Sequence, residues 1–339
     1  MKRSILVLAA LAALLLALAA PAQAHVGAPQ PHQVATLPYG DAGSFAESMV
    51  AVKGGSLYAS LTVWGDSDTG QIWRIDPSGS TRLVASTDVG PAGAFMGLAL
   101  DRAGRLYVAD VDFGGVGDSF IYRVGRDGSF TAVADLPPGS WPNGLACRHG
   151  YLYASDSGLG AIWRVRLGCG VATPSTPWVS SDLLAPGDPA TDPAAVGIGA
   201  NGIAWRGHDL FVVVSDPGRV VRIPVSHLGV PRTPVVVCER PELRTADGVA
   251  FDRCGGLWAV TNAGPTTDQA SGALFRVSLS GAVRQILVDP AWFDYPTQPV
   301  FGRTPCTAAT LYIENGAYSA DAAPSVIALK VGVPGRPMP

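Results

Sequence analysis

The feature of this sequence that most restricts its fold is an internal repeat. Each copy has four apolar stretches. The first contains Gly-Leu/Ile/Val-Ala and is followed by a turn, and the second begins with Leu and an aromatic residue and is followed by a loop with Gly. The third contains an aromatic residue or Arg, and the fourth is short. Five clear copies and a looser sixth cover residues 48–86, 97–136, 144–179, 202–238, 248–288 and 300–331. The leucine of the second stretch recurs every ~50 residues, which is typical of propeller blades.

Each copy contains four apolar or alternating runs separated by Gly, Pro, Asp or Ser, a pattern that predicts four short strands. The 41 Gly, 28 Pro and low charged fraction of 15% suit strands joined by tight turns. One such sheet cannot bury both faces, whereas six sheets packed around an axis can. The sequence therefore predicts an all-β, six-bladed β-propeller with four-stranded blades. A double-barrelled or solenoid arrangement of the same repeats is the alternative.

The two ends of the repeat region complement each other. The sixth copy lacks a fourth strand after Val331, and residues 32–37 (HQVATL) resemble the fourth strands RLVAS and RQILV of other copies. We expect this N-terminal strand to close the last blade, because pairing there removes two exposed edges. Residues 25–339 would then form a single propeller domain.

The first 24 residues have the pattern of an export signal. A basic start at Lys2 and Arg3 is followed by an apolar run over residues 5–20 and an Ala-x-Ala site that ends at Ala24. The run is shorter than the ~20 residues that span a bilayer, and no later stretch approaches that length. We expect cleavage after Ala24, secretion and no membrane insertion.

Charge and cysteine content narrow the range of partners. The net charge is −3 and no Lys/Arg cluster occurs, so the electrostatic signature of a nucleic-acid-binding protein is missing. No CxxC or Cys/His zinc spacing is present. Five cysteines in an exported chain permit up to two disulfides, with the pairing left open. They are Cys147, Cys169, Cys238, Cys254 and Cys306.

The residues just before the Gly-Leu/Ile/Val-Ala stretches should share one rim of the ring and point at its central channel. In order, they are Glu47, Met96, Asn143, Asn201, Asp247 and a residue within 296–299. Two carboxylates and two amides supply hard oxygen ligands, which suit Ca²⁺, although another divalent cation would also fit. The alternative is that Asn-Gly and Asp-Gly simply form turns here.

The same stretches resemble the gluconolactonase and senescence-marker-protein (regucalcin) family of six-bladed propellers, which is related in architecture to paraoxonases and strictosidine-synthase-like proteins. The matching segments are AES at residues 46–48, PNGLA, ANGIAW, ADGVAFD and PVFG ahead of TLY, and the resemblance covers most of residues 25–339. It implies one divalent ion, usually calcium, held by Glu47, Asn143, Asn201 and Asp247. The chain departs from the family at Glu-Ser-Met and Phe-Gly-Arg-Thr, and the resemblance does not assign the family's substrate-holding arginine to a residue of this chain.

A second set of polar residues lies near the ends of the predicted second strands and at the sixth head. We expect these side chains to support the ligand ring or to bind substrate hydroxyls. The alternative is that Asp-x-Gly simply opens the following loop. The candidates are Asp156, Asp216, Asn262 and Gln298.

The leading functional hypothesis is a secreted Ca²⁺-dependent hydrolase, an esterase-type lactonase that acts on a sugar lactone or similar cyclic ester. The family resemblance makes Asp247 the catalytic base as well as a ligand. We expect a small-molecule substrate and a monomer. No G-x-S-x-G, P-loop or H-E-x-x-H motif occurs. The alternatives are a non-catalytic secreted propeller that binds a small ligand or protein, and a strictosidine-synthase-like lyase or condensing enzyme.

Overall fold

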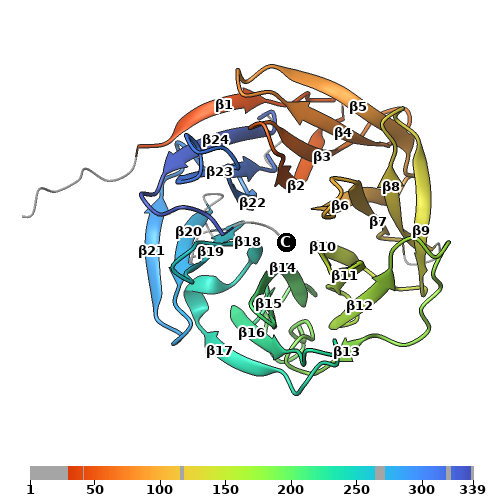
Figure 1. The fold of residues 1–339 in the computed structure, drawn as a ribbon, viewed down its shortest axis with the longest axis vertical. Coiled ribbons are helices and arrows are strands. Elements are labelled where there is room, and N and C mark those ends of the chain that lie inside the picture. Colours follow the sequence, from red (N-terminus) through yellow and green to blue (C-terminus); the bar gives the residue numbers. More distant parts are fainter. Residues whose placement is uncertain (1–29, 41, 115–117, 264–271, 318–321, 337–339) are drawn as a thin grey trace, which may run out of the picture.

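The computed structural model describes residues 30–40, 42–114, 118–263, 272–317 and 322–336, which form six antiparallel sheets around a central axis (Figure 1). The predicted all-β, six-bladed propeller is confirmed. The export signal at residues 1–24 lies outside the described residues and stays a prediction. Within the described ranges, the single-turn 3-10 helix η1 (Pro241–Leu243) is the one helical element, and no helix is long and apolar enough to cross a membrane.

Each of the first five blades is a meander that runs from the channel to the rim. Blade 1 contains β2 (Ser44–Ala51), β3 (Leu57–Val63), β4 (Thr69–Ile75) and β5 (Thr81–Asp88). Blade 2 contains β6 (Gly93–Leu100), β7 (Leu106–Asp112), β8 (Ser119–Val124) and β9 (Phe130–Leu136). Blade 3 contains β10 (Pro142–Arg148), β11 (Tyr151–Asp156), β12 (Ala161–Arg166) and the two-residue β13 (Val179–Ser180).

The second half of the ring repeats this order. Blade 4 contains β14 (Ala200–Arg206), β15 (Asp209–Val214), β16 (Arg219–Pro224) and β17 (Val235–Glu239). Blade 5 contains β18 (Ala246–Phe251), β19 (Leu257–Thr261), β20 (Ala273–Val277) and β21 (Val283–Val288). Blade 6 contains β22 (Pro296–Phe301), β23 (Thr310–Asn315) and β24 (Ser325–Lys330), with β1 (His32–Thr36) as its outer strand. In that pair, Gln33 lies opposite Ile327 and Thr36 opposite Ser325.

The core lies between the blades, because each sheet packs one face against the preceding blade and the other face against the following blade. One cluster joins Tyr107 and Ile121 of blade 2 to Leu152 and Trp163 of blade 3. All eight residues of β2 are buried, so this innermost strand has no solvent-facing side. This packing explains why the innermost strands read as apolar runs without polar alternation.

All five cysteines are free thiols in the structure. Cys238 is buried, Cys147 is partly buried, and the other three are exposed.

Candidate functional site

Every innermost strand has a β-bulge near its first residues. In blades 1 and 6 the register shift skips one residue, Glu47 or Thr297. In the other four blades it skips two consecutive residues, the first of which is Met96, Asn143, Asn201 or Asp247. A bulge removes a residue from the ladder, bends the strand and redirects its side chain. The same backbone feature therefore positions all four predicted ligands. We call these four residues, together with Met96 and Thr297, the head residues. The sixth head is Thr297, which lies within the predicted range 296–299 and one residue before the candidate supporting residue Gln298.

The glycines that follow four of the heads are required by close approach of neighbouring blades. A Cβ on Gly144 would lie 2.7 Å from the carbonyl oxygen of Asn201, and one on Gly202 would lie even nearer to that of Asp247. Neither glycine has a positive φ, and both lie inside strands. The turn interpretation of these Asn-Gly pairs is therefore wrong. Glycine is needed because each head packs against the next one around the ring.

Three buried carboxylates from blades 1, 5 and 6 interact electrostatically at this end of the channel. Burial raises the pKa of Glu47 well above its usual value, and the nearby Asp247 and Glu314 raise it further. Burial, followed by Asp247, likewise raises the pKa of Glu314. Burial raises the pKa of Asp247 to about 7, although hydrogen bonds from Asn262 and Asn201 oppose this rise. Asn262 Nδ2 lies 2.7 Å from Asp247 Oδ2.

The two head amides are oriented by serines that follow the second strands. Asn143 Nδ2 donates to Ser157 Oγ at 3.2 Å, and Asn201 Nδ2 donates to Ser215 Oγ at 3.1 Å. Because the nitrogen of each amide is held, its oxygen is left to bind something else. Asn201 Oδ1 is buried and has no hydrogen-bond partner among the described residues.

Sequence reasoning missed Glu314, which the structure places with Glu47 and Asp247. Both of its carboxylate oxygens are buried without a hydrogen-bond partner in the described part of the chain. Glu314 is the third residue after Leu311 of β23, the position that Ser60 and Ser155 occupy in blades 1 and 3. The hydroxyls of those serines donate to head carbonyls of the following blade. A glutamate in a repeat position that holds Ser, Ala or Val in the other five blades was the available signal.

The chemistry of this donor set fits a hard divalent cation. Buried oxygens without partners are uncommon in proteins, and here they belong to Asn201 and Glu314. Across the described ranges, no three His, Cys, Asp or Glu side chains are arranged so that they could hold a metal ion by themselves. A cation at the heads would therefore need amide oxygens beside the carboxylates.

Two of the predicted supporting residues hold loops, and one contacts a head side chain. Asp156 accepts Trp141 N–H and Leu159 N–H at Oδ1 and the indole N–H of Trp163 at Oδ2. Asp216 accepts four backbone N–H groups, from Gly187, Val196, Gly197 and Ile198. Both carboxylates thus anchor loops, and of the four candidates Asn262 is the one that hydrogen-bonds to a head side chain.

Gln298 lies beyond the sixth bulge and lines a cavity formed by the rest of the innermost strands. Its side-chain amide donates to Pro299 O at 3.0 Å and to Val249 O at 3.4 Å.

Fold and site together define a six-bladed β-propeller with oxygen-bearing side chains at one end of its channel. No protein-family profile matches the chain, and no curated protein matches its sequence. Solved structures do match. Regucalcin from Agrobacterium tumefaciens, described as a calcium-binding protein, has 16% identity and a TM-score of 0.62, with coverage of 92% of this chain and 97% of that one.

Two further propellers show the range of the similarity. A protein described as a gluconolactonase has 16% identity, a TM-score of 0.61 and coverage of 91% of this chain and 94% of its own. The PQQ-bound aldose sugar dehydrogenase from Streptomyces coelicolor has 16% identity, a TM-score of 0.55 and coverage of 89% and 98%. At such identities the likeness shows the fold, which hosts several different chemistries.

Proposed function

We propose that this chain is a secreted, divalent-cation-dependent hydrolase, with Ca²⁺ as the expected ion and a lactone or similar cyclic ester as the substrate. The observation that carries the proposal is the buried group of Glu47, Asp247 and Glu314 next to a partnerless amide oxygen of Asn201. Three buried acids are costly unless a cation or protons neutralise them. Similarity in fold to regucalcin and gluconolactonase structures supports the same hypothesis.

In this proposal the cation is held by Glu47, Asn143, Asn201 and Asp247, with Glu314 as an additional oxygen donor. When bound, the cation would supply Lewis-acid polarisation of the substrate carbonyl. The carboxylate of Asp247 accepts the proton from the attacking water. Without a cation, burial raises the pKa of this carboxyl to about 7; a bound cation would lower it and favour the ionised form that a general base needs. Asn262 fixes the orientation of this carboxylate through Oδ2.

An aromatic pair near the Asn143 head provides an apolar surface for the substrate ring. Phe113 is 49% exposed and packs edge to face on Trp141, with ring centroids 5.0 Å apart. Trp141 lies two residues before Asn143 in the chain. We expect this pair to favour substrates with an apolar ring face or acyl chain.

The first experiment tests the cation. A ligand at 100 times its dissociation constant adds about 2.7 kcal/mol to the free energy of unfolding, so millimolar Ca²⁺ should raise the melting temperature and EDTA should reverse the rise. Glu47→Gln should reduce this shift strongly. A wild-type protein whose melting temperature responds to neither Ca²⁺ nor EDTA would remove the cation from the proposal.

The second experiment tests catalysis. Wild-type protein is assayed on aldonolactones, acyl lactones and aryl esters, with Ca²⁺ or with EDTA. The proposal requires hydrolysis of at least one cyclic ester that depends on the cation. A protein that binds Ca²⁺ but is inert on the whole panel would show that the site is not hydrolytic.

A further inference from the structure

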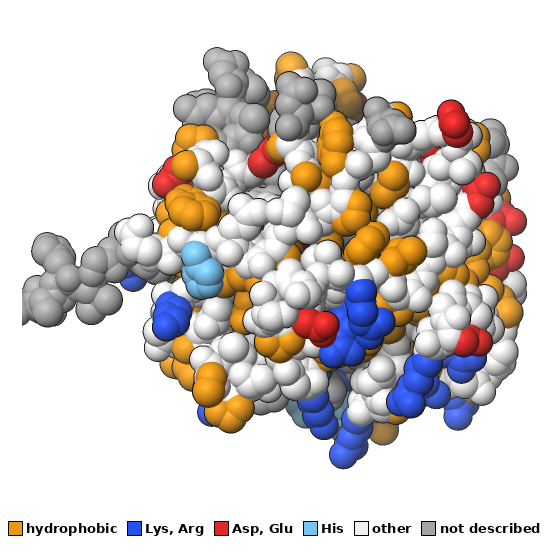
Figure 2. Space-filling model, turned by 90° about the horizontal axis from the view of Figure 1, so that it is seen from above, with side chains coloured by type: hydrophobic (Ala, Val, Ile, Leu, Met, Phe, Trp, Pro, Cys, Tyr) orange, Lys and Arg blue, Asp and Glu red, His pale blue; other side chains and the backbone are white. Residues whose placement is uncertain are grey.

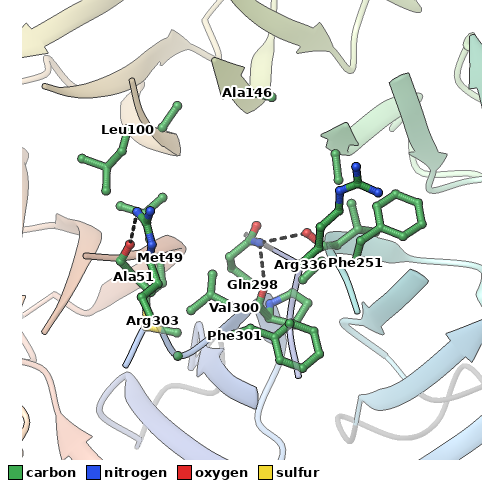
Figure 3. Close-up of a pocket in the computed structure, with 18 of the residues that line it drawn as sticks. Met49, Ala51, Leu100, Ala146, Phe251, Gln298, Val300, Phe301, Arg303 and Arg336 are labelled. Atoms are coloured by element: carbon green, nitrogen blue, oxygen red, sulfur yellow. Dashed lines mark hydrogen bonds between the residues drawn. The ribbon is translucent and has the colours of Figure 1, made fainter. Parts of the chain in front are cut away.

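The channel contains a chamber formed by the parts of the innermost strands that follow the heads. This cavity has a volume of about 650 Å³, and no head residue lines it. Its walls are mostly apolar, with side chains from all six blades, and Figure 3 shows Met49, Leu100, Phe251, Val300 and Phe301 among them.

The mouth of this chamber is cationic. Four basic side chains line it: Lys53, Arg253, Arg303 and Arg336. No Asp or Glu is among the described lining residues. None of the six ion pairs found in the described ranges includes any of the four. The chamber therefore combines an apolar body with a positive entrance that lacks a protein counter-ion.

A basic residue recurs at the same end of the innermost strand in every blade. Every innermost strand carries a basic residue at its last position or two positions beyond: Lys53, Arg102, Arg148, Arg206, Arg253 and Arg303. Arg336 joins them from the C-terminal segment, where its backbone N–H donates to Phe251 O at 2.8 Å. In the edge-on view, Lys and Arg gather in the lower half of the disc and most Asp and Glu lie in the upper half (Figure 2).

Arg303 shows that the protein leaves part of this charge without a counter-ion in the described ranges. Arg303 is partly buried, and its one hydrogen bond among the described residues is a 3.4 Å contact from Nη1 to Ala51 O (Figure 3). Burial lowers the pKa of the Arg303 guanidinium. Burial lowers the pKa of Arg148 and the positive charge of Arg336 lowers it as well, whereas Tyr153 and Asp209 raise it. Like charges held close together in a partly desolvated place favour a bound anion.

We propose that this chamber binds a small organic anion with an apolar body, whose carboxylate, sulfonate or phosphate group lies at the basic mouth. The hydrocarbon part of the ligand packs against Met49, Leu100 and Val300. Deeper in the chamber, Gln298 Oε1 can accept a hydrogen bond from a polar substituent, while its Nε2 donates to Pro299 O and Val249 O. The site is separate from the heads and does not depend on the proposed hydrolysis.

The test uses decanoate as the probe, with isothermal titration calorimetry on the full-length mature protein in EDTA. Decyltrimethylammonium has the same chain with a positive head, and inorganic phosphate has negative charge without the chain. We expect decanoate to bind at least about tenfold more tightly than either comparison compound. Equal binding of the cationic compound would overturn the proposal in favour of plain apolar adsorption. Equal binding of phosphate would reduce the site to a charged surface without an apolar pocket.

Variants then locate the site. The triple substitution Arg253→Gln, Arg303→Gln and Arg336→Gln should weaken decanoate binding by at least about tenfold. The matched control removes three exposed arginines from outer or middle strands, through Arg82→Gln, Arg123→Gln and Arg166→Gln, and should leave affinity within about twofold. A third variant, Ala146→Phe, should fill the chamber and weaken binding without changing charge. Equal losses in the two triple variants would place the anion elsewhere. If the first triple variant does not fold, the comparison of the three probes on wild-type protein still decides.

Discussion

The two ends of the same six innermost strands carry opposite chemistry. At their first residues, six bulges gather buried carboxylates and amides, and the strands touch closely enough to require glycine. At their last residues the strands carry arginine or lysine around an open, apolar chamber. The backbone is common to both ends, so the difference comes from side chains placed at two positions of one repeat. A repeat can therefore build two unlike sites on a single axis.

The two ends of the innermost strands should also differ in how they affect the stability of the protein. The head end holds three buried acids whose raised pKa values show that their charged forms are disfavoured there. The opposite end leaves most of its cations in contact with water, where they cost little. We therefore expect the heads to depend on a bound ligand for stability more than the basic mouth does.

The largest effect should be on catalysis at the heads. Asp247→Asn removes the proposed base and one ligand charge, so kcat/KM for the best lactone should fall by on the order of 10³-fold or more, which is about 4 kcal/mol. The control is Asp127→Asn, which removes the charge of an exposed carboxylate in a turn and should keep wild-type kcat/KM. Activity of the Asp247 variant above a tenth of wild type would exclude the assigned role.

The next effect concerns the close packing of the heads. Gly202→Ala places a methyl group against the carbonyl oxygen of Asp247 and should lower the free energy of unfolding by about 3 kcal/mol. Gly65→Ala is the matched control, since a Cβ there meets nothing within 4 Å and Gly65 has no positive φ. Denaturant unfolding of both variants measures the difference. Similar stabilities would mean that the heads are not in tight contact.

The effect of Glu314→Gln on stability should depend on whether Ca²⁺ is present. With EDTA at pH 8, Glu314→Gln should stabilise the protein by about 1–2 kcal/mol, because it removes a buried carboxylate without hydrogen bonds. With Ca²⁺, the same variant should show a smaller rise in melting temperature than wild type, because an oxygen donor of the site has lost its charge. Destabilisation in both buffers would show that Glu314 is structural and makes no contribution to cation binding.

The smallest effect is a dependence of stability on pH, caused by Asp110 near the apolar Met96 head. Burial, followed by Asp112, raises the pKa of Asp110 from 3.8 to about 7. Since the folded state holds this proton more tightly than the unfolded state, Asp110 lowers stability as pH rises from about 4 to 7, and the loss is complete above 7. Asp110→Asn should therefore stabilise the protein at pH 8.5 and leave its stability nearly unchanged at pH 4. Equal shifts in melting temperature at the two pH values would contradict this assignment.

The repeat length and the turn residues were sufficient to predict the propeller and the place of the heads, because both are set by periodicity within one blade. The sequence could not identify Thr297 as the sixth head, since a bulge without a following glycine has no local signature in Pro-Thr-Gln-Pro. Glu314 was missed because its role depends on contact with the next blade. Asp156 and Asp216 were misleading, because only the folded loops reveal which backbone amides they bind.

The contacts between heads make a continuous hoop. Gly97, Gly144, Gly202 and Gly248 each abut a carbonyl of the following head, and Thr297 Oγ1 bonds to Ala46 O, which returns the chain of contacts to blade 1. The spacing of the oxygen atoms is consequently set by the circumference of this hoop and is insensitive to the rim loops. Those loops are free to diverge in length and composition, so a new specificity can arise at the entrance while the geometry beneath it is inherited unchanged.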